Sequence, residues 1–189
     1  MLDLHSRIRG GVYGCAIGDA LGATVEFMAA DEINQQYGEL RDIVGGGWLD
    51  LTPGQWTDDT EMMIAVAEGI IENPKESVPA IGKRFVNWFQ TNPPDVGLTI
   101  RTVISSVIRS GEWYESSRKL HEESGMTAGN GALMRTLPVG IVYGVSEFPS
   151  DTLVQAHEIA RMTHWDVEAS ATCGLFLNGA FIDPSVLER

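Results

Sequence analysis

Two adjacent carboxylates, Asp58 and Asp59, lie between threonines in the segment Trp56-Thr57-Asp58-Asp59-Thr60, so several oxygen donors meet at one point. Adjacent aspartates repel each other unless a cation lies between or beside them, and hard divalent cations such as Mg²⁺ and Mn²⁺ prefer oxygen ligands. A simpler interpretation is helix capping, because Asp58 and Glu61 have the spacing of a capping box. Capping needs only one aspartate, so both interpretations stay open.

A glycine-rich turn, Gly129-Asn130-Gly131, is expected to enter a helix that ends near Pro138. Free backbone amides at a helix start can form a cradle for phosphate or another anion, and a ligand approaches them closely where glycine has no side chain. The same three residues are more often simply a tight turn. On that simpler interpretation Arg135, which follows shortly afterwards, is only a surface charge.

His164 lies at the junction of two expected helices, one from about Asp151 to Thr163 and one from about Val167 to Ile182. Asp166 is a natural N-cap for the second helix. A histidine at such a junction caps the C-terminal carbonyls of the first helix, which is its more common role, or it hydrogen-bonds a ligand.

Two further carboxylates stand alone in the sequence. Glu26 follows the first expected helix, and Asp95 is presented by the stiff turn Asn92-Pro93-Pro94-Asp95. An isolated acidic residue is usually just solvated. The residue types alone therefore give neither carboxylate a role.

Helices are the elements that must position these groups. Apolar residues recur at helical spacing, for example at Met62, Ala65 and Val66, and strict strand-like alternation is absent. We therefore expect an all-α fold. The first helix, from about Arg7 to Leu21, has a glycine at every fourth position, which predicts a neighbour that approaches closely, usually another helix. These glycines are Gly10, Gly14, Gly18 and Gly22.

The composition indicates one globular domain over residues 1–189. Thirteen Lys and Arg against 26 Asp and Glu give a net charge of −13, which disfavours binding to nucleic acid or to an anionic membrane surface. Cys15 and Cys173 lie in apolar, small-residue stretches and are expected to be reduced core residues, so the location is predicted to be cytoplasmic. No apolar run is long enough to span a membrane.

Taken in the order in which they occur along the chain, these segments resemble those of the ADP-ribosylglycohydrolase family, a group of all-helical hydrolases. The resemblance covers the chain from about Ile8 to Ile182. The matching stretches are Gly14-Cys15-Ala16-Ile17-Gly18-Asp19-Ala20-Leu21-Gly22 with Glu26, Trp56-Thr57-Asp58-Asp59-Thr60, Pro94-Asp95-Val96-Gly97, Gly129-Asn130-Gly131-Ala132-Leu133-Met134-Arg135 and Thr163-His164-Trp165-Asp166.

The resemblance implies a compact orthogonal multi-helix bundle. It also implies metal-dependent hydrolysis of the N-glycosidic bond between ADP-ribose and an acceptor such as a protein arginine side chain, with a pair of Mg²⁺ or Mn²⁺ ions as cofactor. ADP-ribose or an ADP-ribosylated protein would be the partner. The roles that the resemblance implies are metal ligands for Thr57, Asp58 and Asp59, catalytic carboxylates for Glu26 and Asp95, and substrate binding for Gly129, Asn130, Gly131 and His164.

The chain departs from the family pattern at its C-terminal end. Family members normally continue for several more helices and contain a late Asp-x-Asp-Ser/Thr motif, whereas the only aspartate beyond Asp166 here is Asp183. The ligands of the second metal ion are therefore not found in the sequence. A shortened bundle predicts an exposed apolar face near the C-terminus and self-association through it. The alternative to an active hydrolase is a catalytically defective ADP-ribose-binding protein or a structural member of the same fold.

Overall fold

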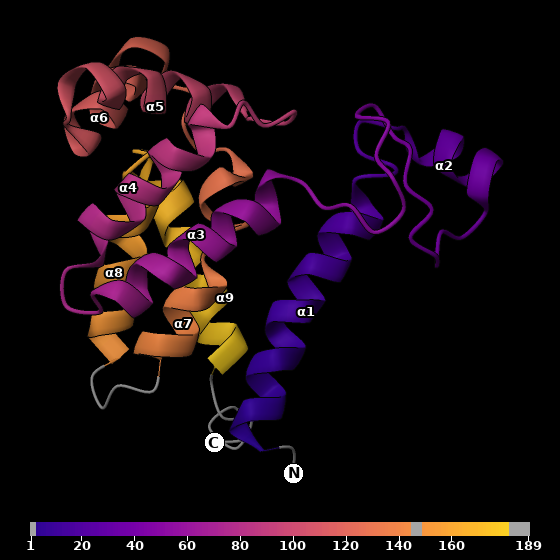
Figure 1. Cartoon of the computed structure of the whole chain (residues 1–189), viewed down its shortest axis with the longest axis horizontal. Helices are drawn as coiled ribbons and strands as arrows, with labels where there is room; N and C mark the ends of the chain where they lie inside the picture. Colours follow the sequence, from indigo (N-terminus) through magenta and orange to yellow (C-terminus); the bar gives the residue numbers. More distant parts are fainter. Residues whose placement is uncertain (1–2, 145–148, 182–189) are drawn as a thin grey trace. The chain divides into compact units, whose positions relative to one another are not determined.

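The fold is described by a computed structural model, which covers residues 3–144 and 149–181. Within these ranges the chain forms nine α-helices and one short 3-10 helix and no strand beyond an isolated bridge between Gly46 and Leu51, which confirms the all-α prediction (Figure 1). The chain divides into two compact units, Met1–Glu61 and Met62–Arg189. Each unit is described by itself, and a single domain over the whole chain stays a prediction.

The first unit is built on a long helix followed by loops. Its elements are α1 (Leu4–Gly22), α2 (Ala30–Tyr37) and the first turn of α3 (Asp58–Glu72). α1 begins three residues earlier than expected because the side chain of Asp3 accepts a hydrogen bond from the backbone N–H of Ser6 at 2.8 Å.

The glycine stripe of α1 has no close neighbour within the first unit. A Cβ added at any of its four glycines would meet no atom of this unit within 4 Å. The helix neighbour that the stripe predicted is therefore not found in this unit. A close approach occurs instead at Gly47, which has φ +68° and where a Cβ would collide with the carbonyl of Ala23. The loop that contains Gly47 thus folds back against the end of α1.

The second unit contains the remainder of α3 and all later helices. These are α4 (Ser77–Gln90), α5 (Leu98–Ser110), α6 (Trp113–Ser124), the 3-10 helix η1 (Asn130–Ala132), α7 (Leu137–Tyr143), α8 (Pro149–Arg161) and α9 (Val167–Phe181). α8 packs on α9 and on α7, and α5 packs on α6. Ile182, at which the last helix was expected to end, and Asp183 lie outside the described residues.

The core of the second unit is formed by the apolar faces that the helical spacing predicted. Val66 and Ile70 of α3, Phe85 of α4 and Ile104 of α5 are fully buried in one cluster. α3 and α4 approach closely at Gly69, where a Cβ would collide with Ile81. Glycine at that position lets the two helices cross at backbone contact.

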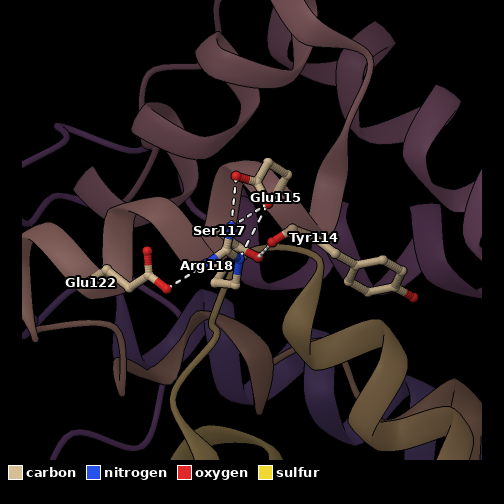
Figure 2. Close-up of polar contacts among 5 residues, drawn as sticks. All are labelled: Tyr114, Glu115, Ser117, Arg118 and Glu122. Atoms are coloured by element: carbon tan, nitrogen blue, oxygen red, sulfur yellow. Dashed lines mark hydrogen bonds and ion pairs between the residues drawn. The ribbon is translucent and has the colours of Figure 1, made fainter.

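α6 is tied to the end of α8 by a buried hydroxyl. Ser117 is 0% exposed and its Oγ donates to the carbonyl of Arg161 at 2.6 Å. On the exposed side of α6, the guanidinium of Arg118 bridges the carboxylates of Glu115 and Glu122 at 2.6 Å each (Figure 2). The Ser117 bond fixes the last turn of α8 immediately before His164.

Apolar side chains remain exposed on α9. Cys173 and Leu177 are buried, but Val167 and Leu175 are 70% and 72% exposed. Self-association through this face stays a prediction. Cys173 is a core residue as expected, whereas Cys15 is only half-buried. In the described ranges, the helices are all too short or too polar to cross a membrane.

Candidate functional site

The oxygen-rich turn at the start of α3 is organised by Asp19 of α1. The carboxylate of Asp19 accepts from the backbone N–H and the hydroxyl of Thr57 at 3.0 and 2.8 Å. It also accepts from the backbone N–H and the hydroxyl of Thr60 at 3.1 and 2.6 Å. The α-helix begins at Asp58. A carboxylate from another helix therefore satisfies the amides of Thr57 and Thr60, while the N–H of Glu61 bonds to the carbonyl of Thr57 at 3.3 Å. The capping-box interpretation of Asp58 and Glu61 stays a prediction.

These hydrogen bonds hold Thr57 and Thr60 in a fixed arrangement, and the Thr57 hydroxyl oxygen also accepts from the N–H of Asp59 at 3.4 Å. The hydroxyl of Thr57 gives its one proton to Asp19, so the oxygen keeps a lone pair for another partner. Thr57 and Asp58 are 9% and 8% exposed. Asp58 and Asp59 lie in the first turn of α3, where the helix dipole favours negative charge.

The side chains of this turn provide some of the oxygen ligands that one hard divalent cation needs. Thr57, Asp58 and Asp59 offer a hydroxyl and two carboxylates, and Mg²⁺ is commonly held by one or two carboxylates while it keeps several waters. Across the described part of the chain, no group of three or more His, Cys, Asp or Glu residues is placed to hold a metal ion. The oxygen donors of this turn are of the type that one such ion accepts, and metal binding itself stays a prediction.

Glu26 lies beyond the end of α1 in an aromatic setting. Its Oε2 accepts from Nε1 of Trp48 at 2.8 Å. The Trp48 ring lies 5.6 Å from that of Phe27, a residue with φ +63° that is 81% exposed. The loop that folds back at Gly47 therefore brings Trp48 to Glu26 and fixes the direction of this carboxylate.

The Gly129-Asn130-Gly131 turn leads into one turn of 3-10 helix, not into the α-helix that we expected. η1 ends at Ala132 and α7 begins only at Leu137, so no α-helix dipole lies behind the turn. His164 lies directly against it: a Cβ on Gly131 would come within 2.6 Å of the ring carbon Cε1 and 3.0 Å of Nε2. The structure thus brings together two of the predicted substrate-binding segments.

His164 is buried and electrically neutral. It is 2% exposed, and burial, followed by the nearby charge of Arg135, lowers its pKa to about 3. Its Nδ1 lies 2.8 Å from Oγ1 of Thr163. A neutral imidazole has one N–H donor and one acceptor nitrogen, so it can hydrogen-bond a ligand without adding charge.

Arg135 is fully buried, so its interpretation as a surface charge is wrong. Its Nη2 donates to the carbonyl of Ile159 in the last turn of α8 at 3.2 Å and to Oγ1 of Thr163 at 2.8 Å. The guanidinium also lies 4.8 Å from the centre of the Phe85 ring. Arg135 therefore caps the C-terminal end of α8, where a positive charge is favourable.

Asp95 lies half-buried in the loop before α5. Ile100, in the first turn of α5, has its Cδ1 2.8 Å from the Cβ position of Gly131. At the other junction Asp166 accepts from the N–H of Glu168 at 2.9 Å, which confirms it as the cap of α9. Asp95 thus precedes the helix that contacts the glycine turn, and its own role stays a prediction.

Sequence reasoning gave no role to Asp19, Thr163 or Arg135. Asp19 was visible only as one carboxylate on a glycine-rich helix, and its partners are 38 and 41 residues away. A signal for Arg135 was present, because apolar residues precede and follow it within three positions, as is typical of a buried segment. The position of Thr163 next to His164 was a second signal.

Together these features define an all-helical protein with an oxygen-rich turn in one unit and a neutral histidine beneath a glycine turn in the other. The profile of the ADP-ribosylglycohydrolase family matches residues 1–181, and the chain belongs to that family. It is 41% identical over 171 residues to the ADP-ribosyl-[dinitrogen reductase] glycohydrolase of Rhodospirillum rubrum. It is 30% identical over 183 residues to the ADP-ribosylarginine hydrolase Tri1 of Serratia proteamaculans.

The chain spans about half the length of the relatives that it matches. The R. rubrum alignment covers 90% of this chain and 55% of that protein, and the S. proteamaculans alignment covers 91% and 46%. A solved structure described as an ADP-ribosylglycohydrolase-related protein complex superimposes with a TM-score of 0.74 at 30% identity, over 90% of this chain and 53% of that one. The family fold is therefore shown for the part of the relatives that this chain represents.

Proposed function

We propose that the chain carries out metal-dependent hydrolysis of the N-glycosidic bond between ADP-ribose and an acceptor such as a protein arginine side chain. The observation that carries this proposal is the Asp19-capped turn at Thr57, Asp58 and Asp59 in a chain of this family. The names of the two relatives, which refer to ADP-ribosylated dinitrogen reductase and to ADP-ribosylarginine, support the substrate class.

We infer the roles of the acidic turn and of Glu26 from the family resemblance. Thr57, Asp58 and Asp59 would hold one Mg²⁺ or Mn²⁺ ion, which would supply Lewis-acid chemistry. Glu26, directed by its bond from Trp48, acts as a carboxylate beside the reacting ribose. A carboxylate can stabilise the positive charge that develops on the sugar as the glycosidic bond breaks.

We propose that Gly129, Asn130, Gly131 and His164 bind the ADP-ribose. In the same proposal Asp95 is a catalytic carboxylate. The net reaction adds the hydroxyl of water to the anomeric carbon of the terminal ribose and its proton to the leaving nitrogen, so a carboxyl group that moves a proton is required. The close packing of His164 against the glycine turn supports a shared binding role for these residues.

The deciding experiment is release of free ADP-ribose from ADP-ribosyl-arginine in the presence of Mg²⁺ or Mn²⁺. We expect release that EDTA abolishes and that the double variant Asp58→Asn/Asp59→Asn lacks. Asp31→Asn, which removes a carboxylate from the first turn of α2, is the matched control and should keep full activity. Binding of ADP-ribose without release would favour the catalytically defective alternative, and neither binding nor release would favour a structural role.

A further inference from the structure

The second unit buries a cation, a hydroxyl and an imidazole in one row. Arg135 and Thr163 are 0% exposed and His164 is 2% exposed. Nη2 of Arg135 lies 2.8 Å from Oγ1 of Thr163, and that oxygen lies 2.8 Å from Nδ1 of His164. The row connects the capped end of α8 to the glycine turn.

The protons in this row can be assigned from the chemistry of the three groups. A guanidinium only donates, so the Thr163 oxygen accepts from Arg135. The hydroxyl then has one proton to give, and Nδ1 of His164 is the acceptor within reach. If Nδ1 carried the proton instead, the hydroxyl proton would lose this acceptor inside the protein, which is unfavourable. Nδ1 is therefore bare, and the single proton of the neutral ring is on Nε2.

The protonated nitrogen lies at the glycine turn. Nε2 lies 3.6 Å from the position of a Cβ on Gly129 and 3.0 Å from that of a Cβ on Gly131. Because neither residue has a side chain, the backbone of the turn lies directly against this edge of the ring, and Cδ1 of Ile100 lies 2.8 Å from the same Gly131 Cβ position. Gly129 is exposed and Gly131 is half-buried, so solvent reaches the turn that covers Nε2.

We propose that Arg135 and Thr163 are positioning residues, which fix His164 as the Nε2–H tautomer so that it donates a hydrogen bond to an oxygen of ADP-ribose held in the Gly129–Gly131 turn. The ligand in this statement rests on the proposed function, whereas the tautomer does not. A fixed neutral donor binds an oxygen acceptor without reorganising when the ligand arrives, and a ring free to change tautomer would lose part of that affinity.

The tautomer is tested by ¹⁵N NMR of the histidine rings in the ligand-free full chain. The His164 signals are identified by their loss in His164→Gln. We expect them to show a protonated Nε2 and a bare Nδ1 in the wild type and in Thr163→Ser, which keeps the hydroxyl. Thr163→Val, which keeps the shape but removes the hydroxyl, should show a mixture of tautomers. A protonated Nδ1 in the wild type overturns the proposal even if Thr163→Val does not fold.

The consequence for binding is measured by calorimetry with ADP-ribose. Thr163→Val should weaken binding by about tenfold, the value of one hydrogen bond, and Thr163→Ser should bind within about threefold of the wild type. Equal affinity of the Val and Ser variants overturns the positioning role. If the wild type binds no ADP-ribose, the proposed function and the ligand named here both fail, while the NMR result still decides the tautomer.

Discussion

The polar groups of the two units are held in place by charges of opposite sign: a carboxylate in the first unit and a buried guanidinium in the second. In the first unit a carboxylate, Asp19, accepts four hydrogen bonds from Thr57 and Thr60 and holds together an acidic turn that is largely buried. In the second unit a cation, Arg135, is held by complete burial against Phe85 and the end of α8. Hydrogen bonds to a carboxylate on another helix therefore fix the acidic turn, whereas packing in the core fixes the cation.

We therefore expect the stability of the second unit to depend far more strongly on Arg135 than the stability of the first unit depends on Asp19. Arg135→Met removes the hydrogen bonds of the guanidinium and leaves the Ile159 carbonyl and the Thr163 hydroxyl with fewer partners in the interior. We expect the free energy of unfolding to fall by about 3 to 5 kcal/mol. Urea unfolding followed by circular dichroism measures this loss. A loss below about 1 kcal/mol would show that burial does not make Arg135 structurally important.

The buried histidine predicts a specific dependence of stability on pH. The pKa of His164 is about 3 in the folded state against 6.5 as its ordinary value, so the unfolded state binds a proton at a higher pH than the folded state. The stability that the neutral ring contributes is present above pH 6.5 and is lost as the pH falls toward 3.

The slope that one such group can produce is at most about 1.4 kcal/mol per pH unit. Unfolding curves of the wild type and of His164→Gln between about pH 7 and 5 isolate this contribution, because most carboxyl groups stay ionised there. The wild type should lose more stability than the variant as the pH is lowered. If the two curves ran parallel, the His164 ring would add no pH dependence to stability, which would mean that the ring is in contact with water.

A pair of glycine substitutions tests how closely His164 packs against the turn. A Cβ on Gly131 would lie 2.6 Å from the ring and 2.8 Å from Ile100, and we expect Gly131→Ala to cost about 1 to 3 kcal/mol. A Cβ on Gly129 would make ordinary contact at 3.6 Å, so Gly129→Ala is the matched control and should be nearly neutral. Thermal unfolding of the two variants in parallel gives the difference; equal losses would contradict the close packing.

In the first unit the corresponding test removes the carboxylate that caps α3. Asp19→Ala leaves the first amides of α3 with water as their only new partner, and we expect a loss of about 1 to 2 kcal/mol. Asp19→Asn, which keeps one acceptor oxygen, should lose less. Asp3→Ala, which removes a cap from the exposed start of α1, serves as the control for a simple N-cap. The ranking from urea unfolding should be Asp19→Ala, then Asp19→Asn and Asp3→Ala.

The helical fold could be predicted from sequence because each helix displays its apolar face within a few turns. The rows of Val66 and Ile70 on α3 and of Ile100 and Ile104 on α5 are local patterns, and the structure buries all four. Asp166 was predictable for the same reason, since a cap acts on amides two or three residues away.

The contacts that organise the candidate site were not predictable, because they join residues far apart in the chain. Asp19 meets Thr60 across 41 positions, and Arg135 meets Thr163 across 28. A carboxylate or guanidinium has the same local sequence signature whether it is solvated or buried. The roles of Asp58, Asp59 and Asp95 stay predictions, since they depend on ligands that the family resemblance implies.

The smallest expected effect comes from Arg118, an exposed arginine of the second unit that makes two ion pairs. Arg118 contacts Glu115 and Glu122 at 2.6 Å, which is shorter than the 2.8 Å hydrogen bond of Arg135 to Thr163, but the three side chains are 40%, 59% and 58% exposed (Figure 2). Water screens such pairs, so Arg118→Met should lower the free energy of unfolding by less than about 1 kcal/mol. Measured beside Arg135→Met under the same conditions, it separates the effect of burial from the effect of charge pairing. If both variants lost the same stability, burial would not determine how strongly this unit depends on a cation.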